Sequence, residues 1–226
     1  MVTIRPYRAT DREKVREIAF ETGFMGESVA WYWGDMRSFS DIWTAYYTDL
    51  EPESTFVAED ADSVMGYLLG CVDTKRAPSP LSAITHQLIR RQLLFRFGTA
   101  GFIWRSIWDL LRNPSVLSGE VSDPRWPSHL HINLLPAARG NGTGRRLMQA
   151  WLARMRSVGS PGCHLGVFAE NTNAIAFFRH MGFELYGHPL LVPGMRLTSG
   201  ARMHLQLMVL TLDSPAAKQG NGADRP

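Results

Sequence analysis

Cysteine is scarce in this sequence, and its placement excludes two kinds of stabilised fold. The 226 residues contain two cysteines, Cys71 and Cys163. They lie far apart in the chain and match neither a disulfide framework nor the paired spacing of a zinc site. Disulfides persist mainly in oxidising compartments, so we expect a reducing compartment and no bound metal.

Long apolar runs are missing as well. No stretch reaches the roughly 18 apolar residues that a membrane-spanning helix requires. The first ten residues, "MVTIRPYRAT", contain no apolar segment of the kind found in secretory signals. We therefore expect a cytoplasmic protein without a membrane partner.

Charge of either sign is limited too. The chain has 24 Lys and Arg against 21 Asp and Glu, which gives a formal net charge of +3. This mildly basic balance suits an anionic ligand but is too weak to predict nucleic-acid binding. A hydrophobic content of 45% with 20% charged residues is ordinary for a soluble globular protein. We expect no nucleic-acid partner.

Strand and helix patterns occupy most of the chain and predict one mixed domain over residues 1–212. Thr10 and Glu13 form a capping-box pattern before a first helix that ends near Gly23. Residues 25–50 are rich in aromatics and predict one or two further helices. The tail, 213–226, is rich in Pro, Ala, Gly, Asn and charged residues, so we expect it to be disordered. Strands are expected at 2–7, 54–60, 63–73, 128–135, 163–168, 183–187 and 203–210, with helices at 142–157 and 171–181.

Residues 78–113 interrupt this order with two helical stretches joined at Gly98. Each stretch has an apolar face, and the arginines outnumber a lone Asp109. We expect a helical hairpin that packs its apolar face on the body and leaves a basic face in water. A lid over an acceptor site, a dimer surface and an interfacial membrane contact remain alternatives. The apolar residues are Leu88, Leu94, Phe95, Ile103, Trp104, Ile107, Trp108 and Leu111.

The stretch "RGNGTG" at 139–144 places three glycines between a predicted strand and a predicted helix. Glycine has no Cβ, so successive N–H groups can converge on phosphate oxygens, and a helix N-terminus adds unpaired donors. A P-loop is excluded because the four-residue glycine spacing and the following Lys are absent. A dinucleotide fingerprint is excluded because Arg145 or Leu147 stands at the third glycine position. The turn predicts an anion cradle of another kind, with a plain turn and helix cap as the alternative.

The spacing Arg-x-x-Gly-x-Gly, filled by Arg139, Gly142 and Gly144 after "LLP", resembles the GNAT superfamily of N-acetyltransferases. A second stretch, "GVFAENTNAIAFFRHMGFELYG", is similar to the fifth strand and following helix of that family. Its matching positions are Asn171, Ala174, Phe178, Gly182 and Phe183. The resemblance implies an α+β fold with a central, mostly antiparallel sheet that is splayed between its fourth and fifth strands and flanked by helices, with 78–113 as an insertion.

The resemblance also implies a site for acetyl-coenzyme A, held through its pyrophosphate by the glycine-rich turn. The backbone of Leu134 and Leu135 would pair with the pantetheine arm, and one N–H of this pair would stabilise the developing oxyanion. The full set of coenzyme-binding residues is Leu134, Leu135, Pro136, Arg139, Gly140, Asn141, Gly142, Thr143, Gly144, Arg145, Asn171, Ala174, Phe177 and Phe178.

Two histidines are candidates for the general base. His129 and His131 lie two apart on the fourth strand and therefore project from one face, which Asn133 continues. Either imidazole can take a proton from an amine, and a buried, hydrogen-bonded core histidine is the alternative for each. Zinc binding by the pair lacks a third ligand.

Two departures from the family pattern weaken the prediction of catalysis. Bacterial relatives often carry Asp where Asn133 stands, and many family members place a tyrosine, as general acid, where this chain has Phe178. Thiolate is a tolerable leaving group near neutrality, because thiol pKa values lie near about 8.5. The predicted function is acetyl transfer from acetyl-coenzyme A to an unknown amine by direct attack in a ternary complex. The alternative is an acetyl-coenzyme A-binding or partner-binding module with little catalysis, and a homodimer stays open.

A closer resemblance is carried by three stretches, "DIWTAYYTDLEPESTFVAED", "HLHINLLPAARGNGTG" and "GSPGCHLGV". They are similar to the acetyltransferase-like C-terminal domain of O-GlcNAcase and its free-standing bacterial relatives. This resemblance implies a stand-alone acetyltransferase-like protein and does not name the acceptor.

Overall fold

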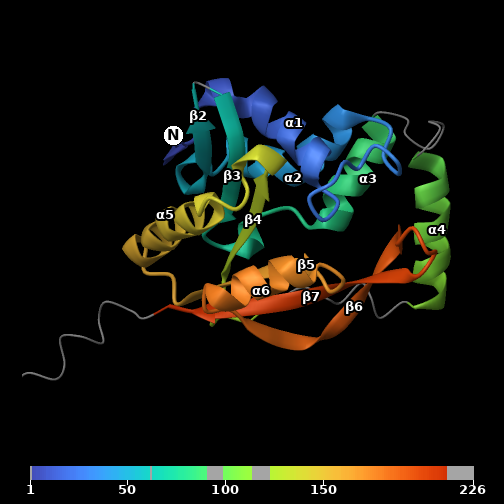
Figure 1. Ribbon diagram of the computed structural model, residues 1–226. Coiled ribbons are helices and arrows are strands. Elements are labelled where there is room, and N and C mark those ends of the chain that lie inside the picture. Colours follow the sequence, from blue (N-terminus) through green and yellow to red (C-terminus); the bar gives the residue numbers. More distant parts are fainter. Residues whose placement is uncertain (1, 62, 91–98, 114–122, 213–226) are drawn as a thin grey trace, which may run out of the picture.

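A seven-stranded mixed sheet forms the centre of the molecule (Figure 1). The computed structural model describes residues 2–61, 63–90, 99–113 and 123–212. The expected tail at 213–226 and the joint at Gly98 lie outside these residues. The strands follow the order β1-β2-β3-β4-β5-β7-β6. They are β1 (Thr3–Pro6), β2 (Phe56–Asp60), β3 (Ser63–Cys71), β4 (Ser128–Leu134), β5 (Gly162–Phe168), β6 (Glu184–Arg196) and β7 (Arg202–Thr211).

All neighbouring strands pair antiparallel except β4 and β5, which run parallel. Their pairing is confined to Ser128 with Cys163 and His129 with His164. Beyond these residues β5 continues along β7 as far as Phe168, while β4 continues along β3 as far as Leu134. The sheet therefore opens between β4 and β5 toward their carboxyl ends, and the α+β class with this splay is confirmed.

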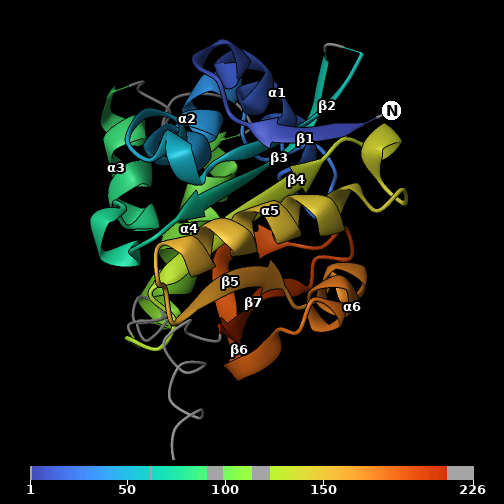
Figure 2. The ribbon, with the colours of Figure 1, turned by 90° about the vertical axis from the view of Figure 1, so that its left-hand side faces the viewer.

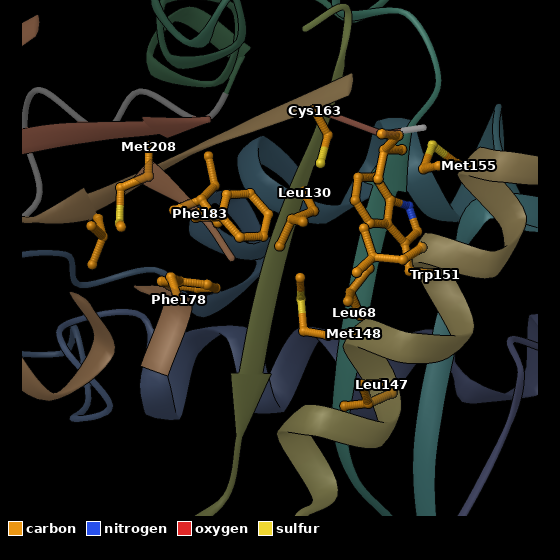
Figure 3. Packing of buried hydrophobic residues seen from close by; sticks show 14 of the residues in the cluster. Leu68, Leu130, Leu147, Met148, Trp151, Met155, Cys163, Phe178, Phe183 and Met208 are labelled. Carbon is orange, nitrogen blue, oxygen red and sulfur yellow. The ribbon is translucent and has the colours of Figure 1, made fainter. Parts of the chain in front are cut away.

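Helices cover both faces of the sheet (Figures 1 and 2). On one face α1 (Arg12–Thr22) and α2 (Met36–Asp49) pack on β2 and β3 through a cluster that includes Ile18, Tyr47 and Leu69. On the other face lie α5 (Thr143–Ser157) and α6 (Thr172–His180). Trp151 of α5 is fully buried in the larger cluster there, which Figure 3 shows.

One local prediction near the start of the chain is wrong. The Thr10–Glu13 capping box does not form, because α1 starts at Arg12 and Glu13 pairs with Arg16 instead. Asp11 occupies the N-cap and is held by the guanidinium of Arg5 at 2.7 Å. The expectation of one or two helices within 25–50 is met by one helix, α2, and the segment before it is a loop.

The strand predicted at 183–187 is also too short. β6 continues to Arg196 through Pro189 and Pro193. Both prolines fall in stretches where the pairing with β7 shifts register, so no ladder bond from their missing N–H is required there. The two prolines argued against a longer strand in the sequence. Pairing with β7 nevertheless extends β6 past both of them.

The helical stretches of the insertion are confirmed as α3 (Pro80–Arg90) and α4 (Thr99–Arg112), but their packing differs from the prediction. α3 contacts α2, whereas α4 contacts β6. Of the α4 residues that we expected to pack on the body, Ile103 is buried, but Trp104, Ile107, Trp108 and Leu111 are exposed, and the side that docks carries the buried Asp109. Leu94 and Phe95 lie outside the described residues. Among the residues that the structure describes, no helix is long and apolar enough to span a membrane.

Candidate active site

The glycine-rich turn is open to solvent, and its backbone requires glycine at two positions. Gly140 has φ +82° and Gly142 has φ +72°, a region that side chains with a Cβ rarely adopt. A Cβ at either residue would have no atom within 4 Å. The turn therefore leaves free space beside its backbone, as a cradle for an anion requires.

The N-terminus of α5 supplies unpaired donors to this space. The first intrahelical bond runs from the N–H of Arg146 to the carbonyl of Gly142, so the N–H groups of the three preceding residues have no intrahelical partner. Thr143 is fully buried, and its Oγ1 has no hydrogen-bond partner among the described residues. An oxyanion at this helix end would satisfy the free backbone N–H groups and would be favoured by the helix dipole. Acetyl-coenzyme A carries such a group in its pyrophosphate, and the residues present fit it.

Arg139 lies at the start of the turn, but its side chain contacts backbone carbonyls. Its Nε and Nη2 donate to the carbonyl of Leu134 at 3.0 and 2.9 Å, and Nη2 also donates to that of Gly26 at 2.7 Å. Gly26 belongs to the loop between α1 and α2. Arg139 therefore ties this loop to the end of β4, and the donors of the cradle are the backbone groups.

The N–H groups of Leu134 and Leu135 point to opposite sides of β4. The N–H of Leu135 donates to the carbonyl of Met65 at 2.9 Å and so faces β3. In an antiparallel ladder the groups of successive residues point to opposite sides. The N–H of Leu134, like that of Ile132, therefore points into the splay between β4 and β5. The oxyanion donor expected from this pair can only be Leu134.

The two neighbouring phenylalanines of α6 point in different directions. Phe178 is 6% exposed and lies in the core against Phe183, as Figure 3 shows. Phe177 is half-buried, and its Cζ lies 3.4 Å from the position of a Cβ on Gly144. Phe177, and not Phe178, therefore borders the cradle.

The remaining predicted coenzyme-binding residues lie on or next to the glycine-rich turn, or at the N-terminus of α6. Pro136 starts a 3-10 turn at Pro136–Ala138. Asn171 caps α6, because its Oδ1 accepts the N–H of Ala174 at 3.1 Å. Asn141 and Arg145 are exposed on the turn and on α5. Asn171 and Ala174 thus have a clear structural role in starting α6.

His129 has both ring nitrogens engaged. The Oγ1 hydroxyl of Thr74 donates to the carbonyl of Pro127 at 2.7 Å, which uses its single proton. The Nδ1 of His129, 2.9 Å from the same Oγ1, must therefore carry a proton and donate it. Nε2 then accepts from the hydroxyl of Tyr47. Burial lowers the pKa of His129 well below its ordinary value, with the neighbouring histidines adding to the effect.

His131 is the histidine with free ring nitrogens. No hydrogen bond to either nitrogen occurs within the described part of the chain, and the ring is only half-buried. It stacks edge-on against Trp43 and Tyr47, with ring centroids 5.9 and 5.5 Å apart. Burial, and then the charge of His164, lower the pKa of His131 to about 4. His131 is therefore neutral near neutral pH and able to accept a proton.

Asn133 lies on the same face of β4 as the two histidines, but its side chain has a structural role. Its Nδ2 donates to the carbonyl of Thr22 at 3.1 Å and to Oγ1 of Thr22 at 2.8 Å. The side chain therefore joins β4 to the end of α1. In the described residues no group of three or more His, Cys, Asp or Glu is arranged to hold a metal.

Sequence reasoning missed the partners that fix these groups. Tyr47 and Thr74 hold His129, Thr22 holds Asn133, and Gly26 holds Arg139. Each partner comes from a distant part of the chain, so no local spacing could have indicated it.

We expect stability to fall as the pH is lowered through the range in which histidine normally titrates. The folded pKa of His131 is about 4, whereas an unfolded histidine titrates near about 6.5. The unfolded state then binds more protons between these values, and stability is lost as the pH falls from about 6.5 to about 4, by up to about 3 kcal/mol for this group. Urea unfolding at several pH values measures this slope. A His131→Phe variant should show a shallower slope, and an unchanged slope would contradict the assignment.

Comparison with known proteins identifies the family. Residues 24–183 match the model of the acetyltransferase (GNAT) family. The chain belongs to the GNAT acetyltransferase family. The match covers the splay, the cradle and α6, which are the parts described above.

Several solved structures share the fold over nearly the whole chain. A protein named SsHAT is 31% identical, with a TM-score of 0.65, and the alignment covers 93% of this chain and 98% of that one. A GNAT phosphinothricin acetyltransferase from Sinorhizobium meliloti, solved with AcCoA, is 21% identical with a TM-score of 0.58, over 98% and 94% of the two chains. YncA from Salmonella typhimurium, solved with acetyl-CoA, is 17% identical with a TM-score of 0.57, over 95% of each chain.

The burial of Phe178 gives a prediction for this GNAT protein. We expect Phe178→Tyr to lower stability by about 1–3 kcal/mol, because its hydroxyl would enter an apolar cluster without a partner. Thermal unfolding measures this, and the rate of thiol release should not rise. Phe177→Tyr is the matched control, since that ring is half-buried and borders open space. A faster, equally stable Phe178→Tyr protein would show that ring 178 faces the coenzyme.

Proposed function

We propose that the protein is an acetyl-coenzyme A-dependent N-acetyltransferase that acetylates an amine by direct attack in a ternary complex. The observation that carries this proposal is the N-terminus of α5. Its first three backbone N–H groups have no intrahelical partner, and two glycines leave open space beside the turn. Within a GNAT fold, an acetylated coenzyme is the anion that suits this position.

The coenzyme is proposed to lie along the turn and then enter the splay. Gly140–Gly144 and Arg145 would hold the pyrophosphate, with Pro136, Arg139 and Asn141 shaping the turn. The backbone of Ile132 and Leu134 would pair with the pantetheine arm, as an added strand pairs with an open edge. Phe177 and Ala174 would line the other side.

When bound, acetyl-coenzyme A supplies a thioester carbonyl that an amine can attack. The N–H of Leu134 faces the splay and would donate to the carbonyl oxygen as charge develops on it. His131 would take the proton from the amine, directly or through a water, with one of its free ring nitrogens. A pKa of about 4 makes His131 a weak base, so it suits an acceptor that already reaches the site as a neutral amine.

No tyrosine stands at position 178 to protonate the departing sulfur. A free thiol has a pKa near about 8.5, so the thiolate leaves without a positioned acid at a reduced rate. We expect His131→Gln to lower kcat about 100-fold while the KM for acetyl-coenzyme A stays constant, because the side chain acts on the amine. His188→Gln, on the exposed part of β6, is the control. An equal loss in both variants would remove His131 from the mechanism.

Calorimetric titration with acetyl-coenzyme A, followed by a thiol-release assay with a panel of amines, tests the proposal. Binding with turnover supports it. Absence of binding at high micromolar coenzyme would overturn the transferase and also the coenzyme-binding form of the alternative below.

The second candidate is a module that binds acetyl-coenzyme A or a partner without efficient transfer. It is favoured by the engagement of both ring nitrogens of His129, by the structural role of Asn133 and by the core position of Phe178. Tight coenzyme binding without turnover for any amine would support this candidate over the transferase.

Kinship with the acetyltransferase-like domain of O-GlcNAcase and a cytoplasmic location belong to the same proposal. The kinship rests on the three stretches quoted above. The location is supported by the two cysteines, which are free and buried.

A further inference from the structure

One face of α4 exposes four large apolar side chains, which we call the α4 patch. Trp104 is 70% exposed, Ile107 40%, Trp108 54% and Leu111 73%. Their spacing places them on one stripe of the helix. Nine large hydrophobic residues are exposed in the described part of the chain, and four of them lie in this stripe. Such a concentration marks an interaction surface rather than scattered surface apolarity.

The exposure of the α4 patch is fixed by how the opposite face of the helix docks. Asp109 is fully buried there, and it accepts the N–H of Gly194 at 2.9 Å and Nη2 of Arg196 at 2.9 Å. The hydroxyl of Ser106 donates to the carbonyl of Pro193 at 3.2 Å. A rotation of α4 about its axis that buried the patch would break the hydrogen bonds of Asp109 with Gly194 and Arg196. The patch is therefore held outward by the fold.

The charges around the α4 patch are of one sign. Arg105 and Arg112 are exposed on α4 itself, and the guanidinium of Arg112 lies 4.3 Å from the ring centre of Trp108. The single acid of α4, Asp109, is buried beneath Arg196 and Arg202. α4 itself thus exposes two arginines, and its one carboxylate is paired on the opposite face of the helix.

We propose that the α4 patch docks this protein on an anionic membrane surface. Tryptophan favours the membrane–water interface, and Ile107, between the two tryptophans, and Leu111, one turn further along α4, can enter the acyl boundary. The flanking arginines would lie at the level of the negatively charged headgroups, each with a favourable electrostatic contribution. A second copy of this chain is disfavoured as the occupant, because it would bring Arg105 and Arg112 of the two copies close together.

The position of α4 leaves the proposed coenzyme site free. In Figure 1, α4 stands at the opposite side of the molecule from α5, whose N-terminus forms the cradle. Membrane docking and coenzyme binding are therefore independent, and either proposal can fail without the other.

Vesicle co-sedimentation of the full chain tests the proposal, with vesicles of phosphatidylcholine alone or mixed with phosphatidylserine. We expect binding to the mixed vesicles that weakens with salt. Leu111→Ser should weaken it about tenfold, because a leucine would leave the acyl boundary. Leu50→Ser is a matched control, since Leu50 is 74% exposed and Leu111 is 73% exposed. Arg112→Gln should weaken binding about fivefold.

Three outcomes would overturn the proposal. The first is that wild-type protein fails to bind phosphatidylserine vesicles. The second is that Leu111→Ser and Leu50→Ser lower binding equally. The third is a wild-type dimer in analytical ultracentrifugation that Leu111→Ser converts to a monomer, which would assign the patch to a second copy.

Discussion

Gly144→Asp is expected to abolish binding of acetyl-coenzyme A without lowering the stability of the protein. Gly144 is the second residue of α5, beside the donors of the cradle. A carboxylate there would accept the free N–H groups and repel a pyrophosphate. Juxtaposed like charges cost several kcal/mol, so we expect at least about a 100-fold loss of affinity.

The stability of the Gly144→Asp protein should rise slightly. A negative charge near a helix N-terminus is favourable, and replacing glycine inside a helix lowers the entropy lost on folding. A Cβ at Gly144 meets Phe177 and Leu134 at 3.4 and 3.5 Å, which is ordinary contact. Gly142 is the poorer choice for this test, because its φ of +72° would strain any side chain.

Titration calorimetry and thermal unfolding together measure both effects. Gln149→Glu adds the same charge to the exposed face of α5 and should bind the coenzyme as wild type does. If Gly144→Asp still binds normally, the cradle does not hold the pyrophosphate. If both variants lose binding equally, the general charge of the helix is responsible instead.

Asp109→Ala is expected to give the largest loss of stability among the changes considered. Removing one partner of a buried ion pair leaves the other charge uncompensated, which costs about 3–5 kcal/mol. Here Arg196 and the N–H of Gly194 would lose their acceptor. α4 also approaches β6 closely, since a Cβ on Gly194 would collide with Ser106 and with the backbone of Phe102. α4 should therefore loosen from β6.

Urea unfolding and hydrogen exchange in α4 measure this change. Asp49→Ala, which breaks a more exposed pair with Arg12, is the control and should cost about 1 kcal/mol or less. The hydrogen bond from Arg196 holds the pKa of Asp109 below its ordinary value. Its contribution is therefore complete above about pH 4 and is lost as the pH falls through the lowered pKa. A deficit in Asp109→Ala that does not shrink in acid would contradict this origin.

Local patterns in the sequence were sufficient for most of the elements. Glycine spacing at 139–144 and the pattern from Asn171 to Phe183 indicated strand, turn and helix in the right order, because backbone conformation and helix capping depend on neighbouring residues. The same patterns indicated the family and the splayed sheet. Local rules failed where a contact with another part of the structure was stronger. Asp11, which is ion-paired with Arg5, occupies the N-cap of α1 that the local pattern assigned to Thr10.

The direction of each side chain was decided by tertiary structure. Phe177 and Phe178 are identical in type and adjacent, yet one borders the cradle and the other is core. His129 and His131 share a face, but only His129 meets Tyr47 and Thr74 and is fully hydrogen-bonded. For α4 the sequence showed an apolar stripe and a lone acid, which predicted that the stripe would be buried.

The sequence by itself therefore determined most of the helices and strands and the glycine turn, and with them the resemblance to the GNAT family. Tertiary structure alone decided that Leu134 rather than Leu135 faces the splay, that His131 keeps its nitrogens free, and that Asp109 turns the tryptophans of α4 toward solvent. The physical reason is that burial and hydrogen bonding are set by partners far away in the chain, and the stronger of two competing contacts fixes which way a side chain points.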